Sequence, residues 1–186
     1  MSDFFQNVPL VYLLLIPAIG MAAFAEEKRV KTIEVLLTLP LSKTKIVFGK
    51  FIAGLLVIIL GLLLTLTIPV TLAFLGSPEW GPIITGYMTV TFLGALYLSV
   101  GLLVSALTDN QIVSFTITAV ICFLFFITGS TFFLDRIPAV VHYPFQMASS
   151  LTHFTSMAKG LIDLRDIVYF LTLIGLFLYL TSKKIE

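Results

Sequence analysis

Charged side chains are concentrated between Glu26 and Lys50, and long apolar runs flank this segment on both sides. The segment contains six of the eleven Lys and Arg residues of the chain. Positive charge between two membrane spans is typical of a cytoplasmic surface. The segment is therefore expected to lie in the cytoplasm, where a membrane subunit could meet a soluble partner.

Apolar residues recur in this segment with the period of a helix. Four of them share one predicted face: Val30, Ile33, Leu36 and Leu37. We predict one helix over residues 26–40, ended by Pro40. Two interpretations stay open. The helix lies at the membrane interface and is anchored by its positive charges, or it is a coupling element that inserts into a soluble ATPase.

A second group of residues that could do chemistry lies near the C-terminal end. It contains His142, His153, Asp135, Asp163 and Asp166. A metal site needs three or four convergent ligands, and these spacings match no compact ligand pattern. The chain also contains no glycine-rich phosphate loop, HExxH or GxSxG motif. We therefore expect no catalytic, cofactor or metal site, and the energy for any transport must come from another protein.

The composition indicates an integral membrane protein, because 59% of the residues are hydrophobic and 11% are charged. Soluble chains average about 25% charged residues. A single all-α domain over residues 1–186 is predicted, with five runs long enough to cross a bilayer. These spans are expected at about 4–24, 46–75, 83–107, 111–134 and 166–181. Residues 25–45 would form the cytoplasmic segment, and 135–165 would form short re-entrant helices outside the cytoplasm.

The distribution of positive charge predicts the orientation. With 25–45 inside, the cytoplasmic set holds eight Lys and Arg residues and the outer set holds three. This asymmetry favours an outer N-terminus and an inner C-terminus. The runs 51–75, 83–107 and 111–134 contain no Asp or Glu, which argues against a proton- or sodium-coupled transporter.

Two long stretches carry a resemblance to a known family: FAEEKRVKTIEVLLTLPLSKTKIVFGKF (24–51) and HFTSMAKGLIDLRDIVYFLTLIGLFLYLTSKKIE (153–186). With GSPEWGP (76–82) and SALTDNQIVSF (105–115), they resemble type-2 ATP-binding-cassette (ABC) permeases over nearly the whole chain. The likeness is closest to the subgroup tied to gliding motility and nitrous-oxide-reductase maturation. Those permeases usually have six spans, and the resemblance implies that this chain lacks the first.

The resemblance implies a multi-pass protein of a bacterial or archaeal cytoplasmic (inner) membrane. It implies a second permease copy or a homologous permease, and two ATPase subunits that bind ATP and magnesium. No nucleic-acid partner is expected, and lipid surrounds the spans. The coupling contact would lie in residues 26–40. Its expected members are Glu26, Glu27, Lys28, Arg29, Lys31, Thr32 and Glu34.

The favoured hypothesis is a permease subunit that moves a substrate when a separate ATPase hydrolyses ATP. One alternative is a mechanotransmission subunit, a membrane anchor that passes ATPase work to an extracytoplasmic partner. A second alternative is a membrane-embedded enzyme that uses the His and Asp residues of 135–165.

Overall fold

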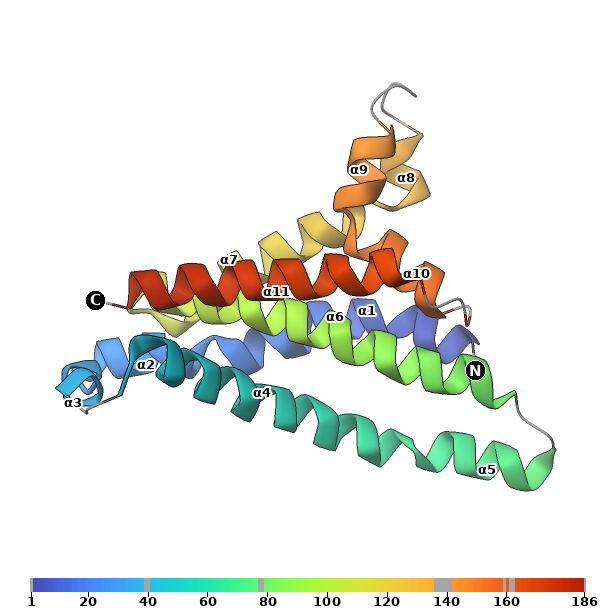
Figure 1. Ribbon diagram of the computed structural model, residues 1–186, viewed down its shortest axis with the longest axis horizontal. Coiled ribbons are helices and arrows are strands. Elements are labelled where there is room, and N and C mark those ends of the chain that lie inside the picture. Colours follow the sequence, from blue (N-terminus) through green and yellow to red (C-terminus); the bar gives the residue numbers. More distant parts are fainter. Residues whose placement is uncertain are drawn as a thin grey trace.

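A computed structural model describes residues 2–38, 41–76, 79–135, 142–158, 160 and 163–185, and the regular structure within them is entirely helical (Figure 1). Pro40, the side chain of Leu37 and part of the expected outer segment (136–141, 159 and 161–162) lie outside the described residues. The helices are α1 (Ser2–Gly20), α2 (Ala22–Arg29), α3 (Ile33–Thr38), α4 (Lys43–Thr65), α5 (Thr67–Leu75), α6 (Trp80–Leu107), α7 (Gln111–Ile127), α8 (Thr131–Leu134), α9 (His142–Ala148), α10 (Ser150–Ala158) and α11 (Leu164–Lys184).

Four helical stretches in the described residues are long and apolar enough to cross a membrane, which confirms the predicted all-α membrane architecture. Two of them join neighbouring helices, because α1 continues into α2 and α4 continues into α5. The break at Leu66 lies one turn before Pro69, whose ring removes a backbone donor and crowds the preceding turn. The four stretches are Phe4–Arg29, Lys43–Leu75, Trp80–Leu107 and Leu164–Lys184.

Helix α6 forms the centre of the bundle, and α1, α4, α7, α10 and α11 pack around it (Figure 1). Small residues allow this close packing. A Cβ atom on Gly20 of α1 would lie 3.2 Å from the Cα atom of Gly101 in α6, so the two backbones cross almost in contact. The large side chains of Leu96, Tyr97 and Leu98 are fully buried in the same helix. This central position makes α6 the rigid reference for the other helices.

The span predicted over 111–134 is wrong in its extent, because α7 ends at Ile127 after 17 residues. A turn follows at 128–130, and α8 then begins a separate short helix. The reason is a close approach from the later chain. A Cβ atom at Gly129 would collide with the Ser149 hydroxyl, and that hydroxyl donates to the Phe125 carbonyl over 3.2 Å. Ser149 therefore satisfies a carbonyl at the end of α7.

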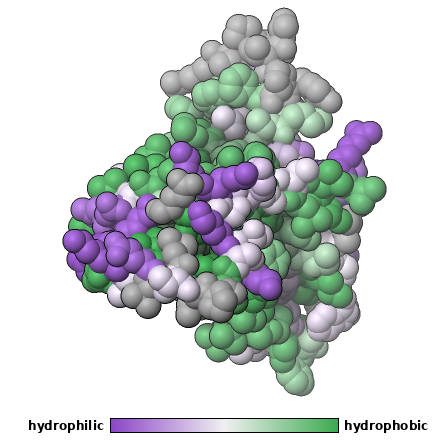
Figure 2. Space-filling view, turned by 60° about the vertical axis from the view of Figure 1, so that its left-hand side comes forward, coloured by the Kyte–Doolittle hydropathy of each residue, from purple (hydrophilic) through white to green (hydrophobic). Residues whose placement is uncertain are grey.

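Most connections lie near one of two opposite ends of the bundle, and α8 and α9 project from its side (Figure 1). The N-terminus, the α5–α6 connection and the α10–α11 connection lie at one end, which we call the α10 end. The α2–α4 connection, the α6–α7 connection and the C-terminus lie at the other, which we call the α3 end. Figure 2 shows hydrophilic side chains gathered over the part of the surface that carries α2 and α3. The charged segment Glu26–Lys50 thus includes one hydrophilic tip of the molecule.

Candidate functional site

The helix predicted over 26–40 is divided by a turn, and this corrects the prediction. Helix α2 ends at Arg29, where the Lys31 amide donates to the Lys28 carbonyl over 3.1 Å and the Thr32 amide donates to the Glu27 carbonyl over 2.9 Å. This pair of bonds is the Schellman arrangement at a helix C-terminus. Lys31 takes the left-handed position with φ 59°, where glycine is usual. Helix α3 then starts at Ile33 in a new direction.

Three of the predicted coupling residues bind groups on other helices of the subunit. Lys28 Nζ donates to the Ala106 carbonyl over 2.6 Å, at the C-terminal end of α6, where the helix dipole favours a cation. Glu27 Oε1 accepts from Lys50 Nζ over 2.6 Å. Glu26 pairs with Arg29 over 2.6 Å and also accepts from the Gln111 side chain. These contacts tie α2 to α4, α6 and α7.

The start of α2 is held by Ser105 of α6. The backbone amides of Phe24 and Ala25 both donate to Ser105 Oγ over 2.9 Å. The same hydroxyl donates to the Met21 carbonyl over 2.9 Å. The α1–α2 break at Met21 leaves these backbone groups without their regular helical partners, and one serine satisfies all three. Phe24 and Ala25 are fully buried, so this contact holds the start of α2 against α6.

The remaining predicted residues lie on the surface between the last residue of α2 and the first turn of α3. We define the exposed turn as Arg29, Val30, Lys31, Thr32 and Glu34, all of which are exposed. The Val30 side chain is 52% exposed, whereas Ile33 is 8% exposed and joins the core. The exposed turn therefore combines an apolar side chain with both signs of charge.

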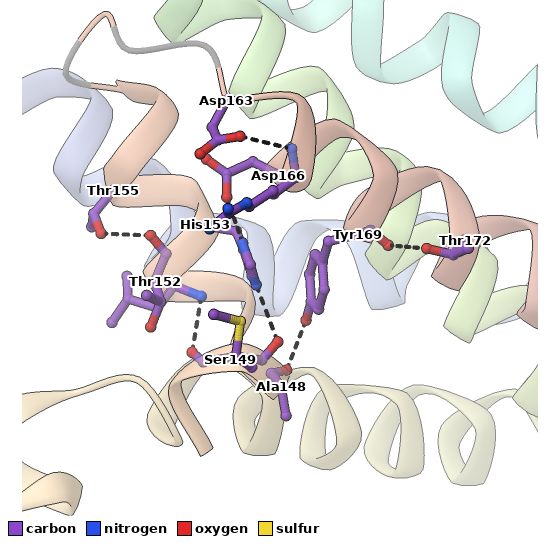
Figure 3. Close-up of polar contacts among 12 residues, drawn as sticks. Ala148, Ser149, Thr152, His153, Thr155, Asp163, Asp166, Tyr169 and Thr172 are labelled. Carbon is purple, nitrogen blue, oxygen red and sulfur yellow. Dashed lines mark hydrogen bonds and ion pairs between the residues drawn. The ribbon is translucent and has the colours of Figure 1, made fainter. Parts of the chain in front are cut away.

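At the α10 end, His153 and Asp166 form a buried pair (Figure 3). His153 Nδ1 lies 2.6 Å from Asp166 Oδ1, and His153 Nε2 lies 3.1 Å from the Met147 carbonyl. A carbonyl only accepts, so Nε2 is the donor in that contact, and Nδ1 faces the carboxylate. The Tyr169 ring stacks on the imidazole at 4.0 Å between centroids, and its hydroxyl donates to the Ala148 carbonyl over 2.7 Å.

The His153–Asp166 contact links two helices. Both imidazole nitrogens are engaged, one by a carboxylate and one by a backbone carbonyl. No group of three or more His, Cys, Asp or Glu residues in the described part of the chain could hold a metal ion. The pair instead joins α10 to the first turn of α11. Sequence reasoning considered both residues as ligands and missed that they bind each other.

An apolar groove of about 570 Å³ lies between α1 and α4. Its lining is formed by apolar side chains such as Val11, Ile16 and Val57, together with Asn7, Tyr12 and Thr65. Both helices belong to membrane-spanning stretches, so the groove is suited to hydrocarbon rather than to a charged solute.

A comparison with known protein families matches residues 8–182 to a family described as "ABC-2 family transporter protein". The match includes the charged tip, the central helix α6 and nearly all of α11. No curated protein matches the chain.

Proposed function

The chain belongs to the ABC-2 transporter family as its membrane domain, and we propose that the exposed turn is the surface that docks the separate ATPase of the transporter. The partner ATPase binds ATP and magnesium and supplies the energy. We further propose assembly with a second permease copy or a homologous permease. The N-terminus lies outside and the C-terminus inside a bacterial or archaeal cytoplasmic membrane, in the gliding-motility and nitrous-oxide-maturation subgroup.

One observation carries the docking proposal: the charged tip is divided into an inner and an outer part. Glu26, Glu27 and Lys28 are partly buried and bind groups of this subunit. Lys31, Thr32 and Glu34 are exposed at the tip. A partner can therefore contact the outer part without opening the inner part. Movement of the turn would pass through α2 to the helices that the inner part binds.

Transport is preferred to mechanotransmission because of the groove between α1 and α4. An apolar path along two spans serves a permease, whereas a sealed anchor that only transmits work to an extracytoplasmic partner needs none. The groove favours a substrate with a hydrocarbon part, and the charge-free lining argues against a small ion.

The test is the substitution Glu34→Lys, which reverses the charge of an exposed side chain on the docking surface. A like charge placed against a complementary surface costs several kcal/mol at an interface. We expect normal membrane levels of the variant and at least a tenfold loss of ATPase co-purification. The matched control is Glu79→Lys, an exposed glutamate at the α10 end, which should leave co-purification unchanged. Undiminished ATPase binding and activity with Glu34→Lys would disprove the docking surface.

A further inference from the structure

We propose that Lys50 is a positioning residue that makes α4 move together with α2 when the ATPase displaces the exposed turn. This inference rests on the proposed function, because it requires an ATPase that acts at the turn. It concerns a different step, namely how a movement at the tip reaches the groove between α1 and α4.

Lys50 lies in the third turn of α4 and extends its side chain to α2. Its Nζ atom donates to the Ala23 carbonyl over 2.6 Å and to Glu27 Oε1 over 2.6 Å. The same ammonium group lies 4.8 Å from the centre of the Phe24 ring. One ammonium group therefore contacts three groups of α2. The Ala23 carbonyl is fixed by the backbone, and the Phe24 ring is fixed by burial. The contact defines both the distance and the rotation of α2 relative to α4.

Few other contacts join these two helices. Helix α2 packs against α6 and α7, whereas α4 packs against α6 and α11. The hydrogen bonds between α2 and α4 in the described part of the chain all come from Lys50. Without them, α4 could keep its place on α6 and α11 while α2 moved. Lys50 thus couples two helices that otherwise rest on a shared third helix.

The exposed turn lies between α2 and α4 in the chain, so a movement of the turn acts on the contact that Lys50 makes between these two helices. The chain leaves α2 at Arg29, passes through the turn and α3, and enters α4 at Lys43. A force on the turn therefore acts between the two helices that Lys50 joins. A fixed α2–α4 distance makes the helices tilt as one unit, and a broken link lets the turn move alone. Because Gly20 keeps α1 packed against Gly101 of α6, a displacement of α4 that follows α2 changes the width of the apolar groove between α1 and α4.

The contact between α2 and α4 depends on the Lys50 ammonium group, because of the second carboxylate oxygen of Glu27. Glu27 Oε2 is buried and has no hydrogen-bond partner in the described residues. Lys50 is thus the group that neutralises this partly buried carboxylate. Removing the ammonium leaves the carboxylate without compensation, and α2 then moves away from α4 to hydrate it. The residue acts through position and not through contact with substrate or nucleotide.

The experiment measures the α1–α4 distance in the complex with the ATPase that co-purifies with the wild-type subunit. Spin labels on cysteines at Leu14 and Leu60, which are 63% and 61% exposed, report this distance in a Cys122→Ala background. Wild type is expected to show one distance without nucleotide and a shifted distance after ATP and vanadate are added. Lys50→Met keeps the apolar stem but removes the donors, so ATPase should still bind while the ATP-dependent shift is lost.

Two variants serve as matched controls. Lys50→Arg restores a cation that can reach the same acceptors and should restore the shift. Lys184→Met removes an exposed lysine from the last turn of α11, away from the α2–α4 contact, and should leave the shift as in wild type. If Lys50→Met fails to accumulate, Glu27→Gln provides the second test, because it removes the ion pair with little change in shape and should reduce the shift.

The possible failures are distinct. A wild-type shift in Lys50→Met, or in Glu27→Gln when Lys50→Met does not accumulate, overturns the role of Lys50. A wild-type complex that binds ATPase but shows no α1–α4 shift also overturns it and leaves the proposed function standing. A wild-type subunit that retains no ATPase activity on purification refutes the proposed function itself.

Discussion

Replacing His153 by Phe is expected to destabilise the subunit more than replacing His153 and Asp166 together. Phe keeps the stacking on Tyr169 but removes both nitrogens, so Asp166 loses its partner and the Met147 carbonyl loses its donor. Asp166 Oδ2 already has no partner in the described residues. Leaving a buried charge unpaired costs about 3–5 kcal/mol.

The double variant His153→Phe/Asp166→Leu removes the stranded carboxylate. What remains is chiefly the unpaired Met147 carbonyl, at about 1–3 kcal/mol. Adding Asp166→Leu to His153→Phe should therefore raise the free energy of unfolding by about 2 kcal/mol, because buried ion pairs can be replaced by apolar groups at little cost. In a chain of this length, that recovery corresponds to a melting temperature about 4–8 °C above that of the single variant.

The assay is thermal unfolding of the purified subunit in detergent, measured for wild type, both single variants and the double variant. Such a cycle isolates the interaction between the two side chains. Combining His153→Phe with Asp109→Leu, at the α3 end, gives the control, and these two effects should simply add. The pairing would be refuted if the melting temperature of the double variant His153→Phe/Asp166→Leu were equal to or lower than that of His153→Phe.

Two further predictions concern the tip and the topology. Lys31→Gly should raise the stability of the isolated subunit by about 1 kcal/mol in the same thermal assay, because left-handed backbone is costly for a residue with a Cβ; a lower melting temperature would contradict the Schellman turn. In a Cys122→Ala background, a cysteine at Ser42 should react with an impermeant reagent from the cytoplasm and one at Glu79 from outside, and the reverse pattern would invert the proposed orientation.

The membrane-spanning helices could be predicted because length and hydropathy alone determine which segments cross a bilayer. The residues at which these helices begin and end could not be predicted. The loop predicted before residue 83 is shorter in the structure, since α6 begins at Trp80 and contains Pro82 in its first turn, where a missing amide costs nothing. The end of α7 at Ile127 depends on Ser149, which approaches Gly129 from twenty residues further along the chain.

The division of the charged tip could not be read from local sequence. The turn after Arg29 contains no glycine or asparagine to mark it, and Lys31 takes the left-handed position instead. The apolar period of the segment continues across the turn, so it predicted one helix. Which charges are internal depends on partners far away in the sequence: Lys28 binds the Ala106 carbonyl and Glu26 binds Gln111. Only packing of α2 on α6 and α7 brings these groups together.

The internal pairs also determine what the ATPase meets at the tip. Glu26 with Arg29 and Glu27 with Lys50 form neutral pairs, and Lys28 is matched by the negative end of the α6 dipole. Four charged side chains near the turn have no ion-pair partner in the described residues: Lys31, Glu34, Lys43 and Lys45. Three are positive, so the complementary ATPase surface should be mainly acidic, with one basic group for Glu34. Glu26 and Glu27 therefore hold the tip together, and in the proposed docking the unpaired lysines would select the partner.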